Sequence, residues 1–313
     1  MYKNLIKIST VGMEREEWLS YRRKSIGGSD AAAILGLNPF SSPYSVWADK
    51  LGHLPDKEDT EALRIGRDLE DYVARRFTEA TGKKVRRENN ILINPDYPFA
   101  HANVDRVVIG EDAGLECKTT SSLNLKKFKN GTFPETYYVQ CVHYMMVTGA
   151  KIWYLAVIVL GREFMYFTIE RDEEEIAALA KGEEEFFRLV ETKTAPVADG
   201  KQSTTEAIAA VYPDNTSEAV SLIGYEGELQ TYNAICARIK ELERDKDECA
   251  NKTKAFLGEC EGGESDGFKV SWRNTVKQSF DYKRFIEDHE GIDLSGYFKQ
   301  SSYRAFKVIK KQN

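Results

Sequence analysis

The chain has 313 residues, of which 42% are hydrophobic and 30% are charged, a balance typical of a chain that buries a core. Its longest apolar run, residues 152–160, is far shorter than the about 20 residues that a membrane-spanning helix needs, so we expect no transmembrane helix. Because the first residues lack the apolar stretch of a secretory signal, we expect a cytoplasmic protein.

The formal net charge is −6, from 44 basic and 50 acidic residues. The acidic excess lies in residues 170–191, whereas residues 118–134 and 299–313 carry lysine or arginine and no acidic residue. The net charge therefore does not exclude local basic surfaces, although these segments could equally be solvated faces. The five cysteines and four histidines show no zinc-ligand spacing, so we expect neither a zinc site nor a disulfide framework.

Caps, proline, glycine and apolar spacing predict four helices in the first 82 residues. These helices are expected at residues 14–24, 31–35, 43–51 and 61–81. A Gly-Gly-Ser-Asp segment precedes the second helix, and either Ser29 or Asp30 is its expected N-cap.

The middle of the chain alternates strand and helix patterns and predicts a mixed α/β fold. Strands are expected at residues 90–94, 103–109, 114–119, 152–160 and 163–169, and helices at 134–148 and 172–192. The last two strands are separated by a glycine and an arginine, which predicts a hairpin.

The C-terminal third differs in composition. Residues 197–225 are rich in small polar residues and predict a linker or loose connection between a first domain, 1–196, and a C-terminal region, 226–313. That region is expected to contain a long helix up to residue 256 and short strands around 268–272 and 304–308. Its helix has heptad-like spacing, so the region either associates with a partner or packs on the first domain.

The most informative chemical pattern is Asp105 followed by Glu116 and Lys118. Side chains alternate along a strand, so Glu116 and Lys118 face the same side, and Asp105 joins them if its strand pairs with theirs. Two carboxylates suit a hard cation such as Mg²⁺, and a lysine beside them can orient a water for attack on a phosphodiester. The alternative is a salt-bridged hairpin at the surface.

Three other features could complete such a site. Glu70 lies beside an apolar helix stripe, where a carboxylate is costly unless it is paired or metal-bound; the alternative is a boundary residue. Arg22 precedes Ser29 by seven residues and could share a phosphate with it, or be an exposed arginine beside a capped turn. Tyr137, Gln140 and Tyr144 share one helix face, which could touch substrate or be half-buried.

These residues occur in an order that resembles the YqaJ-type viral recombinase nucleases, the phage family that includes lambda exonuclease. The similarity covers about residues 14–191. It rests on Trp18, Arg22, residues 26–39, Ser42, Pro43, Tyr44, Gly66, Glu70, Asp105, Glu116, Lys118, Gln140 and residues 169–173.

The resemblance implies a PD-(D/E)XK restriction-endonuclease-like fold, a mixed sheet flanked by helices. It also implies Mg²⁺-dependent digestion of linear duplex DNA, 5′ to 3′, with Mn²⁺ able to replace Mg²⁺. The implied metal ligands are Asp105, Glu116 and the backbone carbonyl of Cys117. Lys118 and Glu70 would complete the catalytic set, and the implied DNA contacts are Arg22, Ser29 and Gln140.

The implied partners are double-stranded DNA ends, a phage single-strand annealing protein and further copies of the chain, within the cytoplasm of a bacterium that carries the phage or prophage. Two other functions remain open, a DNA-end-binding recombination scaffold and an endonuclease or resolvase on the same fold. The family's second glutamine is replaced by Val142, which puts any role needing both in doubt.

Overall fold

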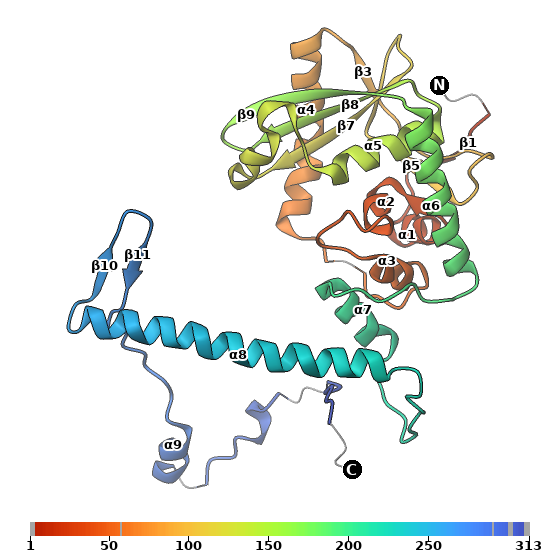
Figure 1. Cartoon of the computed structure of the whole chain (residues 1–313). Coiled ribbons are helices and arrows are strands. Elements are labelled where there is room, and N and C mark those ends of the chain that lie inside the picture. The colour runs from red at the N-terminus through yellow and green to blue at the C-terminus, as the bar shows by residue number, and fades with distance from the viewer. Residues whose placement is uncertain (1–3, 57, 290, 300–302, 310–313) are drawn as a thin grey trace. The chain divides into compact units, whose positions relative to one another are not determined.

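The structure is a computed structural model that describes residues 4–56, 58–289, 291–299 and 303–309. Its contacts divide the chain into two compact units, Met1–Pro213 and Asp214–Asn313. The first unit thus extends beyond residue 196, where the sequence suggested a boundary. Figure 1 labels the elements of both units.

The first unit is built on a five-stranded sheet of order β3-β6-β7-β8-β9. The central strands β7 and β8 are parallel, and the other neighbours are antiparallel. Almost every residue of β8 is buried, as expected of a strand covered on both faces. The sheet strands are β3 (Val85–Arg87), β6 (Arg106–Val108), β7 (Ala113–Thr120), β8 (Ile152–Val159) and β9 (Glu163–Glu170).

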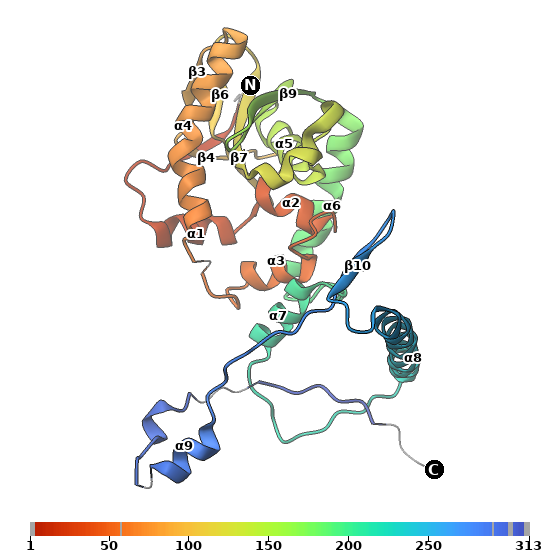
Figure 2. The same ribbon diagram turned by 90° about the vertical axis from the view of Figure 1, so that its left-hand side faces the viewer.

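Helices cover both faces of this sheet (Figure 2), which confirms the expected fold class. On one face, α4 (Glu61–Thr81) packs Val73 and Phe77 against the sheet. On the other lies α5 (Glu135–Thr148), which is buried almost throughout because α2 (Gly28–Ile34) and α6 (Glu173–Glu191) both pack on it. The predicted hairpin is confirmed as β8 and β9.

A second sheet of order β1-β4-β5-β2 lies in the same unit. Its strand β2 (Ile26–Gly27) runs directly into α2 (Gly28–Ile34). The expected N-cap is wrong: Gly27 is the cap, and Asp30, at the third helical position, reaches back to accept a hydrogen bond from the Gly27 amide. The remaining elements of the unit are β1 (Ile6–Ser9), α1 (Arg15–Arg23), α3 (Pro43–Lys50), β4 (Asn90–Ile93), β5 (Ala100–Asn103) and the 3₁₀ segment Ser122–Gly131.

The segment expected to be a linker contains a helix, α7 (Gln202–Val211), that belongs to the first unit. Its small residues Thr204 and Ala207 are buried, and the helix packs on α3. Because small side chains let two helices approach closely, a composition that resembled a linker forms a packed helix here.

The second unit contains the expected long helix, α8 (Glu226–Leu257), followed by the hairpin of β10 (Gly262–Glu264) and β11 (Lys269–Ser271), α9 (Tyr282–Asp288) and the 3₁₀ turn Ser295–Tyr297. The strand expected around residues 304–308 is wrong, since 303–309 form no regular element. Instead the ring of Phe306 packs edge-on against Tyr232 of α8. Within the described residues, no helix is long and apolar enough to cross a membrane.

The packing of the sheet leaves no room for a side chain at Gly114 of β7. A β-carbon there would lie 2.3 Å from the indole ring of Trp153, its register partner on β8. We expect Gly114→Ala to lower the free energy of unfolding by about 3 kcal/mol, since overpacked cores cost roughly that much. Gly200→Ala, where nothing lies within 4 Å, is the matched control. Equal denaturation midpoints for the two variants would contradict this packing.

Candidate active site

The pairing of β6 with β7 brings the predicted residues together. Arg106 lies opposite Leu115 in an antiparallel pair, so the preceding residue, Asp105, comes next to Glu116 of β7. Its Oδ2 accepts a hydrogen bond of 2.8 Å from the Cys117 amide. The Lys118 ammonium lies 2.5 Å from Glu116 Oε1. Two carboxylates and one ammonium group thus converge where β6 and β7 pair.

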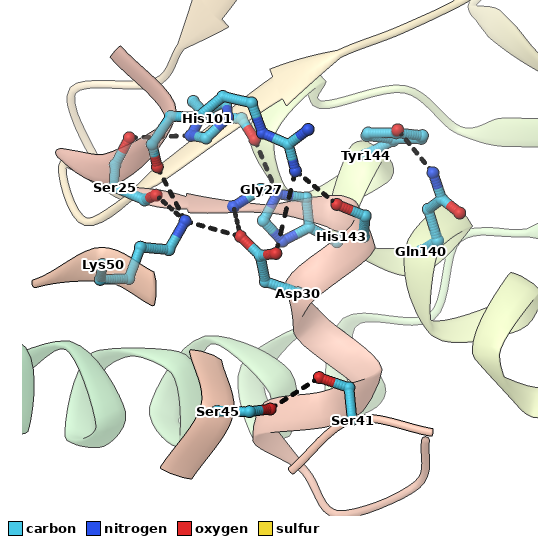
Figure 3. A network of polar contacts seen from close by, with 12 residues as sticks. Ser25, Gly27, Asp30, Ser41, Ser45, Lys50, His101, Gln140, His143 and Tyr144 are labelled. Carbon is cyan, nitrogen blue, oxygen red and sulfur yellow. Dashed lines mark hydrogen bonds and ion pairs between the residues drawn. The ribbon is translucent and has the colours of Figure 1, made fainter. Parts of the chain in front are cut away.

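The helix α5 supplies the other side of this cluster. Gln140 donates to Glu116 Oε1 at 2.9 Å and lies 2.8 Å from the Tyr144 hydroxyl. Figure 3 shows the Gln140–Tyr144 contact. The ring of Tyr137 lies 5.3 Å from Lys118 Nζ, in cation–π range. The helix face predicted from Tyr137, Gln140 and Tyr144 therefore faces the carboxylate and the lysine.

Burial makes the electrostatics of the cluster unfavourable for bare carboxylates. Burial, together with the nearby Glu116 and Glu70 carboxylates, raises the pKa of Asp105 well above its usual range. Burial alone would lower the pKa of Lys118, but the Glu116 and Asp105 carboxylates outweigh it and raise that pKa. A cation near these oxygens would relieve the repulsion between the carboxylates.

One oxygen of the cluster has no partner. Glu116 is 3% exposed, and its Oε2 is buried without a hydrogen bond within the described residues. No group of three or more His, Cys, Asp or Glu side chains in the described part of the chain has the geometry to hold a metal ion. Two carboxylates nevertheless fit Mg²⁺, which uses one or two of them and keeps several waters. Asp105, Glu116 and the Cys117 carbonyl would be its ligands.

Glu70 lies close to this cluster but is held by another residue. It pairs with Arg106, which is almost fully buried and also donates to the Asp105 carbonyl at 2.7 Å and to Asp71 at 2.6 Å. Its direct partner is therefore an arginine, and no ion pair between Glu70 and Lys118 would be possible without a shift of that pair. Arg106 is not among the predicted site residues, although a charged residue amid β-branched ones is a signal of a buried pair.

Arg22 and Ser29 form a second polar site, separate from the carboxylate cluster. Arg22 Nη2 donates to Ser29 Oγ at 2.7 Å, and the guanidinium also stacks on Trp18. The Arg22 side chain remains 30% exposed, so it can still donate to an anion from solvent. These two predicted phosphate contacts therefore share one small polar surface.

A buried lysine builds the floor of this surface (Figure 3). Lys50 donates to the carbonyls of Arg22 and Ser25 at 2.7 and 2.8 Å and to Asp30 Oδ2 at 2.7 Å. Burial would raise the pKa of Asp30, but Lys50 and then Arg22 outweigh it and hold that pKa well below its usual range. Lys50, which the sequence analysis did not single out, thereby ties the end of α1 to the start of α2.

Two buried histidines extend the network. His101 Nδ1 shares a hydrogen bond of 2.8 Å with Ser25 Oγ, and burial and the Lys50 charge lower its pKa to about 3. His143 Nε2 lies 2.9 Å from the His101 carbonyl, and its Nδ1 lies 2.7 Å from Glu183 Oε1. Because both His143 nitrogens face acceptors, the His143–Glu183 pair holds a proton between them.

The Arg22–Ser29 surface and the carboxylate cluster are connected through α5. A β-carbon on Gly28 would lie 2.8 Å from the Tyr144 ring, so only glycine lets the α2 start approach this helix so closely. Tyr144 in turn contacts Gln140, which holds Glu116. The Arg22–Ser29 surface and the carboxylate cluster are therefore linked by a short series of direct contacts.

Comparisons with known proteins identify the family. The YqaJ-like viral recombinase domain matches residues 17–151. A curated relative, the uncharacterized protein YqaJ of Bacillus subtilis (strain 168), is 39% identical over 298 residues, which is 92% of this chain and 93% of the relative. The chain therefore belongs to the YqaJ-like viral recombinase family.

Solved structures show the fold. LHK-Exo in complex with dAMP superposes with a TM-score of 0.50 at 21% identity, covering 57% of this chain and 93% of LHK-Exo. The structure described as an alkaline exonuclease (LHK-Exo) from Laribacter hongkongensis superposes over the same shares, at 20% identity and a TM-score of 0.49. The chain thus shares the fold of LHK-Exo over 57% of its length.

His101 makes stability depend on pH. Its folded pKa of about 3 lies below the 6.5 of an unperturbed histidine, so the unfolded chain binds more protons between these values and the fold loses stability as pH falls. From pH 6.5 to 5 this loss amounts to about 2 kcal/mol. Denaturation at several pH values should show a flatter dependence for His101→Gln than for the exposed-site control His53→Gln. Parallel pH dependences of stability for the two variants would contradict the lowered pKa of His101.

Proposed function

We propose that the protein is a metal-dependent exonuclease that digests linear double-stranded DNA from 5′ to 3′ and leaves 3′ single-stranded tails. The observation that carries this proposal is the unpartnered Glu116 Oε2, buried beside Asp105 and Lys118. The family and the LHK-Exo fold support a nuclease acting on DNA. The Arg22–Ser29 contact supports action at an end rather than within a strand.

Each residue of the cluster has a task that its position allows. Bound Mg²⁺ or Mn²⁺ would supply a Lewis acid that stabilises charge on the phosphate oxygens. Asp105 and Glu116 present their oxygens to it, while Gln140 fixes the orientation of Glu116. Lys118 donates hydrogen bonds that orient the attacking water or the scissile phosphate.

The Arg22–Ser29 contact supports the proposed direction of digestion. A 5′-terminal phosphate bound by Arg22 and Ser29 would receive charge-assisted hydrogen bonds from an arginine that Lys50 and Asp30 hold in position. The contacts through Gly28, Tyr144 and Gln140 keep that phosphate at a fixed position relative to Glu116.

We further propose the setting in which the activity is used. The 3′ tails would be bound by a phage-type single-strand annealing protein, in the cytoplasm of a bacterial host. The protein would act as a homo-oligomer, since an assembly around DNA keeps an exonuclease on its substrate. These proposals extend the recombinase family to which the chain belongs.

The nuclease is tested with linear duplex DNA in Mg²⁺ or EDTA. Lys118→Ala should reduce digestion by at least about 100-fold, since positioned donors at a reacting phosphate contribute that much. Lys126→Ala, which removes an exposed lysine from the following segment, should digest like the wild type. Intact DNA in every lane, from protein shown to be folded, would favour the DNA-end-binding scaffold instead.

The end pocket is tested by comparing substrates with a 5′ phosphate and a 5′ hydroxyl. Arg22→Gln should lower the preference for the phosphate by about tenfold or more, the value of a hydrogen bond to a charged group. Arg23→Gln is the matched control, because that neighbouring arginine pairs with Asp56. An unchanged preference in Arg22→Gln would exclude this residue from phosphate recognition.

A further inference from the structure

A groove of about 420 Å³ lies between α4 and the edge strand β3, and its charged lining is almost entirely arginine. In Figure 2 these two elements run beside each other. The charged residues that line it are Arg75, Arg86, Arg87, Arg106 and Asp71. An excess of guanidinium groups around one groove is typical of a surface that binds phosphates.

The local concentration of charge is unusual for this chain. Residues 75–87 hold six basic residues and one acidic residue, whereas the whole chain has a net charge of −6. The helix α4 contributes the first part of this segment and β3 the last, so folding brings both parts to the same groove. A cationic surface of this kind attracts a polyanion even when the net charge of the protein is negative.

Ion pairs within the fold involve three of the four arginines, but only two of them are held tightly. Asp71 accepts from Arg87 at 2.5 Å and from Arg106 at 2.6 Å, so these two are neutralised within the fold. Arg86 uses one nitrogen, Nη1, which lies 3.4 Å from Glu88 and 3.3 Å from the Arg87 carbonyl, and its side chain is 55% exposed.

The Arg75 guanidinium is also available to a ligand. It is exposed, and its contact with an aromatic ring, Tyr72 at 5.7 Å, uses no carboxylate; no ion pair of Arg75 is found within the described residues. Arg75 and Arg86 therefore keep donors for a ligand, whereas Arg87 and Arg106 shape the groove.

The groove begins beside the catalytic cluster. Arg106, at its wall, follows Asp105 directly, donates to the Asp105 carbonyl and pairs with Glu70. Through Arg106 the groove therefore adjoins Asp105 and Glu70. Glu116 and Lys118 lie on the opposite face of the sheet, toward α5. The ligand that fits a shallow groove with separated arginines next to a phosphodiesterase centre is a nucleic-acid backbone, whose phosphates repeat along the strand.

We propose that the α4–β3 groove binds the phosphodiester backbone of the DNA substrate, through Arg75 and Arg86, next to the site of hydrolysis. This inference rests on the proposed nuclease function and adds a sequence-independent contact surface to it. Each arginine that neutralises a phosphate releases counterions, so its removal reduces the salt dependence of binding.

The test is equilibrium binding of a linear duplex to the full chain in EDTA across a range of salt concentrations. Arg75→Gln and Arg86→Gln should each reduce the magnitude of the slope of log K against log salt by about 0.9, and the double variant by about 1.8. Arg86→Lys should restore most of the slope, because the charge is retained. Arg162→Gln, at the β8–β9 turn on the opposite edge of the sheet, is the matched control.

Melting curves show first that the variants fold. Slopes of the groove variants equal to that of Arg162→Gln, or a wild type that binds no duplex, would overturn the groove. Hydrolysis in Mg²⁺ is scored separately: digestion by the wild type with unchanged slopes refutes the groove alone. Groove-dependent binding without digestion would refute the nuclease and leave the groove standing.

Discussion

The structure depends on holding the Glu116 carboxylate inside the protein, where a bare charge is costly. Lys118 and Gln140 both approach Oε1, whereas Oε2 has no hydrogen-bond partner within the described residues. This requirement explains why α5, an otherwise apolar helix between the sheet and α6, carries an amide and two tyrosines on the face toward β7. The same oxygens are those that the proposed metal would bind.

The Arg22–Ser29 surface is built in a similar way, from a buried charge that fixes exposed ones. Lys50 satisfies two backbone carbonyls and the Asp30 carboxylate, and Asp30 holds the Gly27 amide at the start of α2. A residue that never touches substrate thus sets the position of those proposed to do so. Replacing a buried pair by one lone charge would be strongly destabilising. A change to Lys50 or Asp30 that disrupts this surface would therefore also destabilise the fold.

Much of this could be predicted from local patterns. Strand alternation placed Glu116 and Lys118 on one face, and the expected hairpin of β8 and β9 is present, because both depend on neighbours in sequence. The Arg106–Glu70 pair joins residues 36 positions apart, and no periodicity reports such a contact. Lys50 lies on an expected helix, but a buried lysine and a solvated one give the same pattern. For the same reason the composition of α7 predicts part of a linker, because the burial of this helix depends on α3.

The central claim is that these residues digest DNA from its 5′ ends. The most direct test is a time course in Mg²⁺ on linear duplexes whose terminal linkages are replaced by phosphorothioates at either the 5′ or the 3′ ends, with a closed circular duplex alongside. The account predicts that only the 5′ block slows digestion and that the circle stays intact. Digestion stopped by the 3′ block, or cleavage of the circle, would contradict it.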